Sequence, residues 1–223
     1  MSTVFIVSKV TNYSLKTIIF KTIASLFFIA VAIVAFCLSG EGHFLFKLFT
    51  VLGLFFGLLG DVFLGFKYIT TKTKKLWILL GMFAFIFGHI FYLVGLIVGF
   101  YIPGNALYIV LCFTIPVVIV AIYLLIAKKS GIVFGKMLPF AILYIYCLAS
   151  MLSTSICIGI LNRFTYTTLI MFAVGAFFFA CSDFMLSGSY FKPGQRPKAY
   201  NAVYSVFYYL AQFIIAFSIF FLV

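Results

Sequence analysis

Residues 44–66 read FLFKLFTVLGLFFGLLGDVFLGF, a run whose only polar side chains are Lys47, Thr50 and Asp61. An apolar run of about 20 residues is long enough to cross the hydrocarbon core of a bilayer as one helix. Backbone in lipid must satisfy its own hydrogen bonds, and this run lacks the alternating pattern of a barrel strand. We therefore predict a membrane-spanning helix over these residues.

The same pattern recurs along the whole chain. Its residues are 66% hydrophobic and only 8% charged, with a mean hydropathy of +1.33, which no water-soluble surface accommodates. The intervals between helix-breaking or charged residues predict seven spans, at about 17–38, 44–66, 76–100, 105–127, 133–157, 165–187 and 202–223. The connecting segments are too short for a second domain. We expect residues 1–223 to form one all-α transmembrane bundle.

Basic residues are concentrated on one side of the predicted spans. They occur before or at the start of the first span and in the second, fourth and sixth connecting segments, whereas the other side has only Lys47 and Arg163. The positive-inside rule then places the N-terminus in the cytoplasm and the C-terminus outside. We expect a multi-pass protein of the cell (plasma) membrane. The net charge of +12 reflects this orientation and attraction to anionic headgroups, and no nucleic-acid partner is expected.

Two of the three acidic residues, Asp61 and Asp183, lie inside predicted spans. A carboxylate at membrane depth costs about 2.5–3.5 kcal/mol on insertion scales, so such a residue indicates a functional site. Each aspartate follows a small residue and precedes a leucine by three positions. Both predicted spans run from outside to inside, and each aspartate falls four or five residues before the cytoplasmic end. We predict a paired site at one depth.

Small residues recur at helical spacing around both aspartates. The stripes are Gly53, Gly57, Asp61 and Gly65 in one span, and Ala173, Ala176, Ala180, Asp183 and Ser187 in the other. Because small residues allow neighbouring helices to approach closely, each stripe is expected to face the interior of the bundle.

Further polar residues occur in the third and seventh spans. His89 and Tyr92 share one helix face, as do Tyr208 and Gln212, with Tyr209 adjacent. These residues could belong to a site, or they could bond across helices as mid-span polar residues commonly do. Both interpretations stay open for them, whereas Tyr200 and Tyr204 fit an interfacial aromatic belt.

Several chemistries are disfavoured by simple counting. The chain has only two histidines, His43 and His89, too few for a three-histidine zinc site, and we expect no metal and no cofactor. Its five cysteines form no Cys-x-x-Cys pair and are expected to be packing residues. Ser182 lies in no Gly-x-Ser-x-Gly motif, so it is not predicted to be a nucleophile.

Four short motifs occur in a characteristic order. They are LGDVFL at residues 59–64, FGHIFY at 87–92, FACSDFML at 179–186 and YYLAQ at 208–212. With these motifs the chain, from about residue 21 to its end, resembles the YhhN-type lysoplasmalogenases. Those integral membrane enzymes cleave the vinyl ether bond of lysoplasmalogens. The resemblance implies eight spans, where this sequence predicts seven.

The resemblance implies a lysophospholipid substrate in contact with membrane lipids. Cleavage of a vinyl ether needs an acid to protonate carbon and an anion to support the cation that forms. Burial and a like-charged neighbour both favour the neutral form of one carboxyl group of a pair, so Asp61 and Asp183 are the expected catalytic residues, without an assignment of which is the acid. The expected substrate-binding residues are His89, Tyr92, Ser182, Tyr208, Tyr209, Gln212 and Lys67. Lys192 and Arg196 could also meet a phosphate headgroup.

A proton- or cation-coupled transporter is the alternative, since buried acids also serve as proton relays. Asp-x-x-Leu in the second and sixth spans hints at an internal repeat of the kind found in transporters. Transporters commonly have helices broken at the site, however, and the only prolines within spans, Pro116 and Pro139, lie away from both acids.

Overall fold

The computed structural model describes residues 15–67, 71–194 and 197–222. Among these residues, seven helices are long and apolar enough to cross a membrane. The helices are α2 (Leu15–Leu38), α3 (Phe44–Phe66), α4 (Lys74–Phe100), α5 (Ala106–Lys129), α6 (Leu138–Leu161), α7 (Thr167–Phe191) and α8 (Lys198–Ser218). Three short 3₁₀ turns, η1 (Thr71–Thr73), η2 (Gly135–Met137) and η3 (Ile219–Phe221), lie next to helix ends. The predicted all-α bundle of seven spans is confirmed.

Several predicted span ends were wrong by four or five residues, including the end of the fifth span, at Leu161, and the start of the seventh, at Lys198. The fifth span begins at Leu138 because Gly135–Met137 form a 3₁₀ turn and Pro139 lies in the first helical turn. The sixth span continues to Phe191, since the helix passes through Gly188, whose missing side chain leaves room for the Tyr200 hydroxyl. Asp183 therefore lies eight residues before its helix end, about 12 Å at 1.5 Å per residue, and not four or five residues.

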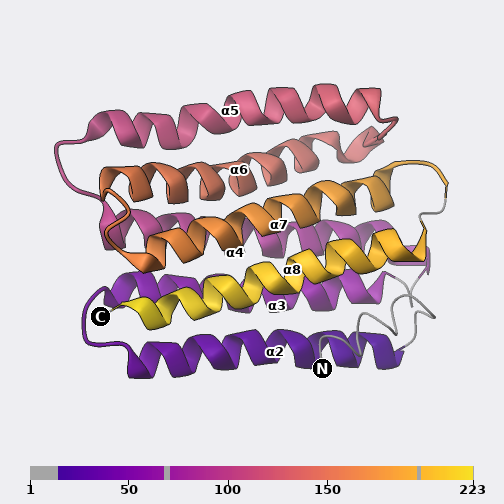
Figure 1. The fold of residues 1–223 in the computed structure, drawn as a ribbon. Helices are drawn as coiled ribbons and strands as arrows, with labels where there is room; N and C mark the ends of the chain where they lie inside the picture. Colours follow the sequence, from indigo (N-terminus) through magenta and orange to yellow (C-terminus); the bar gives the residue numbers. More distant parts are fainter. Residues whose placement is uncertain (1–14, 68–70, 195–196, 223) are drawn as a thin grey trace.

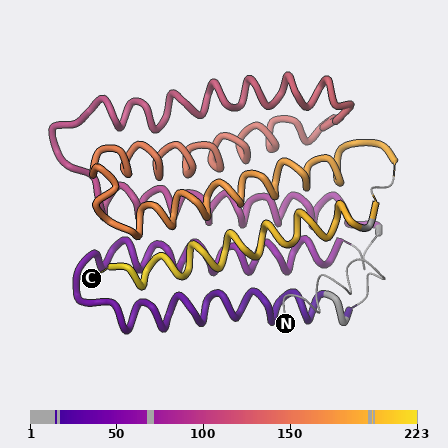
Figure 2. Tube along the Cα trace, in the orientation of Figure 1, coloured from indigo at the N-terminus to yellow at the C-terminus, as the bar shows by residue number. Residues whose placement is uncertain are grey.

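The helices run alternately up and down, as the ribbon and the tube show (Figures 1 and 2). Neighbours in sequence pack as the pairs α3 with α4, α5 with α6 and α7 with α8. Contacts of α4 with α6, of α6 with α7, and of α2 with α3 and α8 join these pairs into one bundle. Helix α5 lies at one edge and packs on α6 (Figure 1). Most of its surface therefore remains available to lipid.

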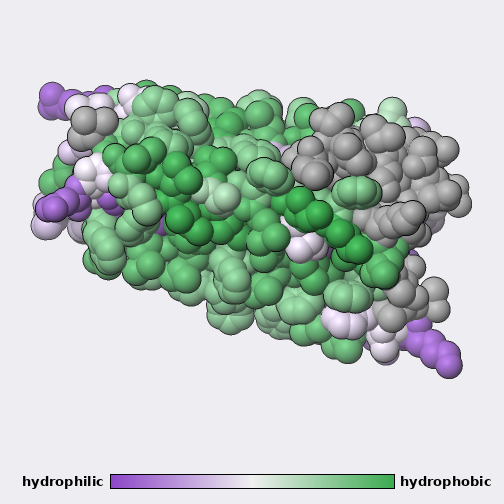
Figure 3. Space-filling view, turned by 90° about the horizontal axis from the view of Figure 1, so that it is seen from below, coloured by the Kyte–Doolittle hydropathy of each residue, from purple (hydrophilic) through white to green (hydrophobic). Residues whose placement is uncertain are grey.

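The outer surface fits a membrane. On the face drawn in Figure 3, apolar side chains cover the middle of the molecule and hydrophilic ones gather at its two ends. Together with the seven long apolar helices, this distribution identifies an integral multi-pass membrane protein.

The glycine stripe of α3 faces the bundle interior, as predicted. A Cβ atom added at Gly88 of α4 would lie 3.1 Å from the carbonyl oxygen of Gly53, so the two backbones are nearly in contact. Gly53 also makes room for the ring of Tyr92, and Gly65 packs against Ile18 of α2. The interface between α3 and α4 thus depends on residues without side chains.

The stripe of α7 behaves differently. Ala176 is fully buried, but Ala180, Asp183 and Ser187 line a cavity. Small residues in this half of α7 therefore leave open space in place of a close helix contact.

One of the two exceptions to the predicted charge pattern, Lys47, has a structural explanation. Its side chain is buried, and its ammonium group donates to the carbonyl oxygens of Ser39, at 3.3 Å, and Gly40. These acceptors follow the end of α2, where carbonyl groups lack helical partners. At the same end of the bundle, Asn162 donates to the Phe100 carbonyl at the end of α4, over 2.9 Å.

Candidate active site

Asp61 lies on α3 and is almost completely buried, with 1% of its surface exposed. Its Oδ1 atom is 2.6 Å from the Lys21 ammonium nitrogen on α2. Its Oδ2 atom accepts hydrogen bonds of 2.7 Å from Ser25 of α2 and 2.7 Å from Tyr208 of α8. One cation and two hydroxyl donors therefore surround this carboxyl group.

A line of polar side chains continues from Asp61 into the middle of the bundle. The Gln212 amide donates to the Tyr208 hydroxyl over 3.1 Å, and the Tyr92 hydroxyl donates to the Gln212 carbonyl oxygen over 3.1 Å. Gly57 leaves room for the Gln212 amide, since an added Cβ would lie 2.6 Å from its nitrogen. Each donor in this line points toward Asp61, so each bond polarises the next in the same sense.

Asp183, on α7, has a less polar environment. The Tyr144 hydroxyl of α6 donates to its Oδ2 atom. Among the residues that the structure describes, no cation pairs with Asp183. The two aspartates therefore differ in kind, because one belongs to an ion pair and the other borders an apolar space.

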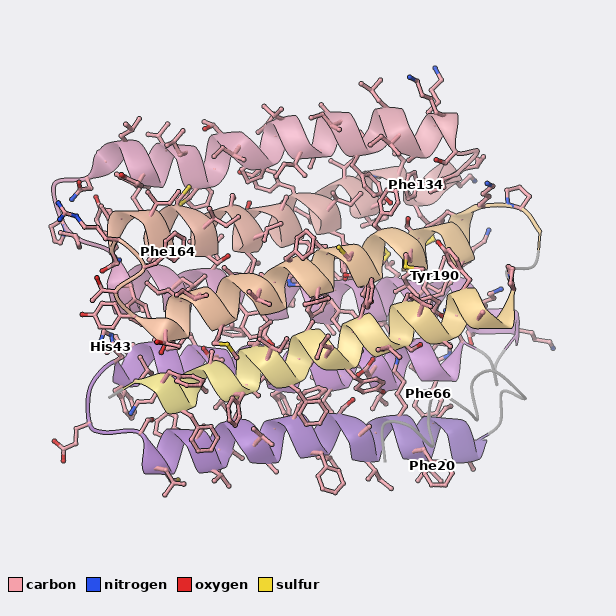
Figure 4. The ribbon with its side chains drawn as sticks, in the orientation of Figure 1. Phe20, His43, Phe66, Phe134, Phe164 and Tyr190 are labelled. Atoms are coloured by element: carbon pink, nitrogen blue, oxygen red, sulfur yellow. The ribbon has the colours of Figure 1, made fainter. Side chains whose placement is uncertain are left out.

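That space is a cavity of about 510 Å³ between α5, α6 and α7, closed on the inner side by Leu64 of α3 and Phe85 of α4. The polar side chains that line this cavity are those of Asp183, Tyr144, Tyr123, Ser187 and Tyr190. The apolar lining includes Met82, Ile119, Phe134, Ala141, Ile145, Leu148, Ala149, Leu152, Phe177, Ala180, Phe184, Leu186 and Phe191. Figure 4 shows Tyr190 and Phe134 toward the end of the bundle where α5 finishes and α6 begins. The volume falls in the range of sites that hold one small ligand, roughly 300–1,000 Å³.

A second, smaller cavity of about 30 Å³ brings the two acids together. Lys21, Asp61, Ser182, Asp183, Tyr208 and Tyr209 are among its lining residues. Leu64, Phe85, Asp183, Leu186 and Tyr190 line both cavities. A polar cavity of this size has room for a water molecule, which needs roughly 10–15 Å³. Asp61 and Asp183 therefore border the same small polar space.

The remaining predicted substrate-binding residues have different surroundings. His89 is buried, its ring centre 5.5 Å from that of Tyr144 and 4.9 Å from that of Phe179, and neither ring nitrogen has a hydrogen-bond partner among the described residues. Ser182 donates to the Tyr204 carbonyl over 2.9 Å. The Lys67 ammonium lies 3.0 Å from the ring centre of Tyr190.

The structure says little about the two other residues that could meet a phosphate headgroup. Lys192 is exposed beyond the end of α7, and Arg196 lies outside the described residues.

Sequence reasoning missed three residues of the site: Lys21, Ser25 and Tyr144. Lys21 is one of the basic residues at the start of the first span, which we used only to predict orientation, although Lys21 and Ser25 share one face of α2 at a spacing of four. Tyr144 had no distinguishing signal, because Tyr146 lies two positions away in the same span.

Comparison with known proteins identifies the family of the chain. A family model described as the YhhN family matches residues 16–219. The chain belongs to the YhhN family. No curated protein and no solved structure matches the chain. The YhhN match extends from the second residue of α2 to the end of α8 and includes all the residues described here around the two aspartates.

Proposed function

We propose that this YhhN-family protein is a membrane hydrolase that cleaves the vinyl ether bond of a lysophospholipid. The products are a fatty aldehyde and a glycerophospho-alcohol. The supporting observation is that two buried aspartates of unlike environment border one polar space, which shares five lining residues with a large apolar cavity. Two carboxyl groups whose surroundings favour opposite protonation states are the usual requirement for acid-catalysed cleavage at an ether.

In this proposal Asp183 is the acid. An apolar cavity favours the neutral form of a carboxyl group. The bond from Tyr144 occupies Oδ2, which leaves Oδ1 to carry the acid proton. Asp61, paired with Lys21, is the anion.

The proposed reaction has three steps. Asp183 transfers its proton to the alkene carbon that does not bear oxygen, and the electron pair of the double bond forms the new C–H bond. The resulting oxocarbenium cation is captured by water, which loses a proton to the Asp183 carboxylate, and the hemiacetal then separates into aldehyde and alcohol. Asp61 stabilises the cation electrostatically and orients the water in the small cavity.

The buried polar line is assigned a supporting role. Tyr92 and Gln212 bond to each other and, through Tyr208, to Asp61, so they orient Asp61 and do not need to touch the lipid. Tyr209 and Ser182 line the small cavity beside the reacting bond. His89 supports the Tyr144 ring, and Lys67 with Tyr190 borders the headgroup end. The protein acts in the plasma membrane with its N-terminus in the cytoplasm.

The test is aldehyde release from an alkenyl lysophospholipid by the purified protein. Asp61→Asn and Asp183→Asn should each reduce the rate by about 10²–10⁴-fold, the range for a lost acid or base. The double variant should be little worse than either single variant, since the two residues act as a unit. Glu41→Gln is the matched control, because Glu41 is the third acidic residue and is exposed between α2 and α3.

A saturated alkyl lysophospholipid should bind without reacting. If alkenyl and alkyl lipids are both recovered intact while sealed vesicles show an Asp61-dependent proton flux, the hydrolase proposal is wrong. The alternative, a proton-coupled transporter, then takes its place.

A further inference from the structure

The large cavity reaches the lipid-facing surface along α7. Phe177 and Phe184 line it and are also 56% and 42% exposed. They lie seven residues apart on one face of α7, which corresponds to an opening about 10 Å long at 1.5 Å per residue. Ile119 and Tyr123 of α5 line the facing side. A chain in the bilayer can therefore reach the cavity sideways between α5 and α7.

A polar bridge crosses the cavity at one place. The Tyr123 hydroxyl of α5 donates to Ser187 Oγ of α7 over 2.6 Å, and Ser187 donates to the Phe184 carbonyl over 2.7 Å. Among the described residues, none donates to the Tyr123 oxygen, which keeps its lone pairs available to another hydroxyl. We call Tyr123 and Ser187 the hydroxyl bridge.

The hydroxyl bridge lies one helical turn from the acid. Ser187 follows Asp183 by four residues on α7, about 6 Å along the axis. In a glycerolipid with one vinyl ether chain, the neighbouring free hydroxyl is five covalent bonds from the protonated carbon. Five bonds in an extended chain also span about 6 Å. With the reacting carbon at Asp183, that hydroxyl falls at the bridge.

We propose that Tyr123 and Ser187 recognise the free hydroxyl of a single-chain glycerolipid, whose chain occupies the 510 Å³ cavity through the opening between α5 and α7. This inference rests on the proposed function, because it takes Asp183 as the position of the reacting carbon. An acyl group on the hydroxyl would separate Tyr123 from Ser187 and add a second chain to a cavity sized for one ligand. The bridge therefore selects lysolipids over two-chain lipids.

The experiment measures binding and needs no cleavage. Purified protein in detergent is titrated with a saturated alkyl-ether lysophospholipid and with its 2-deoxy analogue, which lacks only the free hydroxyl. The intact protein should bind the hydroxyl lipid about tenfold more tightly, as expected for a hydrogen-bonding group left without its partner. Tyr123→Phe and Ser187→Ala should reduce this ratio to about twofold or less.

The matched control is Tyr146→Phe. Tyr146 also bonds across to α5, at the Phe113 carbonyl over 3.2 Å, but does not line the cavity. It should keep the tenfold ratio. Equal binding of the two lipids by the intact protein, or an unchanged ratio in Tyr123→Phe, would overturn the inference. Aldehyde release from the alkenyl lipid is measured separately, so a protein that discriminates but does not cleave contradicts the proposed function alone.

Discussion

At the residue scale, Asp61 forms an ion pair with Lys21 inside the bundle. Removing one partner of a buried ion pair leaves an uncompensated charge, whereas removing both leaves none. Lys21→Met should therefore lower the free energy of unfolding by about 3 kcal/mol, measured as a loss of thermal stability in detergent. The double variant Lys21→Met with Asp61→Asn should recover at least half of that loss while remaining inactive.

The control for this pair is Lys72→Met, because Lys72 is exposed at the same end of the bundle and its loss should leave stability unchanged. A Lys21→Met protein as stable as the parent would mean that Asp61 is neutral in the folded protein. The assignment of Asp61 as the anion would then fail.

The hydroxyl of Tyr144 is the other single group on which the site depends. It donates to Asp183, and in the proposed mechanism it stabilises the carboxylate that remains after proton transfer. A hydrogen bond to a charged group contributes about 1.5–3 kcal/mol, so Tyr144→Phe should slow aldehyde release roughly 10- to 100-fold. Binding of the saturated lysolipid should change little. Equal rates for Tyr144→Phe and Tyr146→Phe would remove Tyr144 from the mechanism.

At the scale of elements, the α3–α4 interface positions the polar line that supports Asp61. A Cβ added at Gly53 would lie 2.3 Å from the Tyr92 ring, whose hydroxyl bonds to Gln212. Gly53→Ala should therefore displace Tyr92 and lower the free energy of unfolding by about 1–3 kcal/mol, the usual range for overpacking. Thermal unfolding and aldehyde release both measure the effect.

The comparison for Gly53→Ala is Gly40→Ala, since nothing lies within 4 Å of a Cβ built at Gly40. If both variants unfold at the same temperature, the close approach of α3 and α4 does not stabilise the fold.

At the scale of the whole molecule, the remaining prediction is orientation. The lysine-rich connections α3–α4 and α5–α6 lie at one end of the bundle and the α2–α3 connection at the other (Figure 1). On a background without the five native cysteines, Lys74→Cys and Lys129→Cys should be protected from an impermeant thiol reagent in intact cells, whereas Glu41→Cys should react. All three positions are exposed. Labelling of Lys74→Cys in sealed cells would reverse the orientation.

The sequence by itself determined the seven spans and the all-α class, and it singled out Asp61 and Asp183 as the acids inside those spans. Insertion into lipid depends on the composition of each segment separately, and a carboxylate at membrane depth is costly wherever it occurs. Both the spans and the unusual acids can therefore be recognised from short stretches of sequence. Helical spacing was likewise enough to predict that Asp61 faces inward beside Gly53 and Gly57.

Only the tertiary structure distinguished the two acids. Lys21, Ser25 and Tyr208 reach Asp61 from two other helices, and Tyr144 reaches Asp183 from a third. No spacing along the chain predicts such contacts, because they depend on which helix faces pack together. The cavity is likewise a property of packing, since the small residues of α7 resemble a helix contact in sequence and become the wall of an open space only because α5 packs on α6.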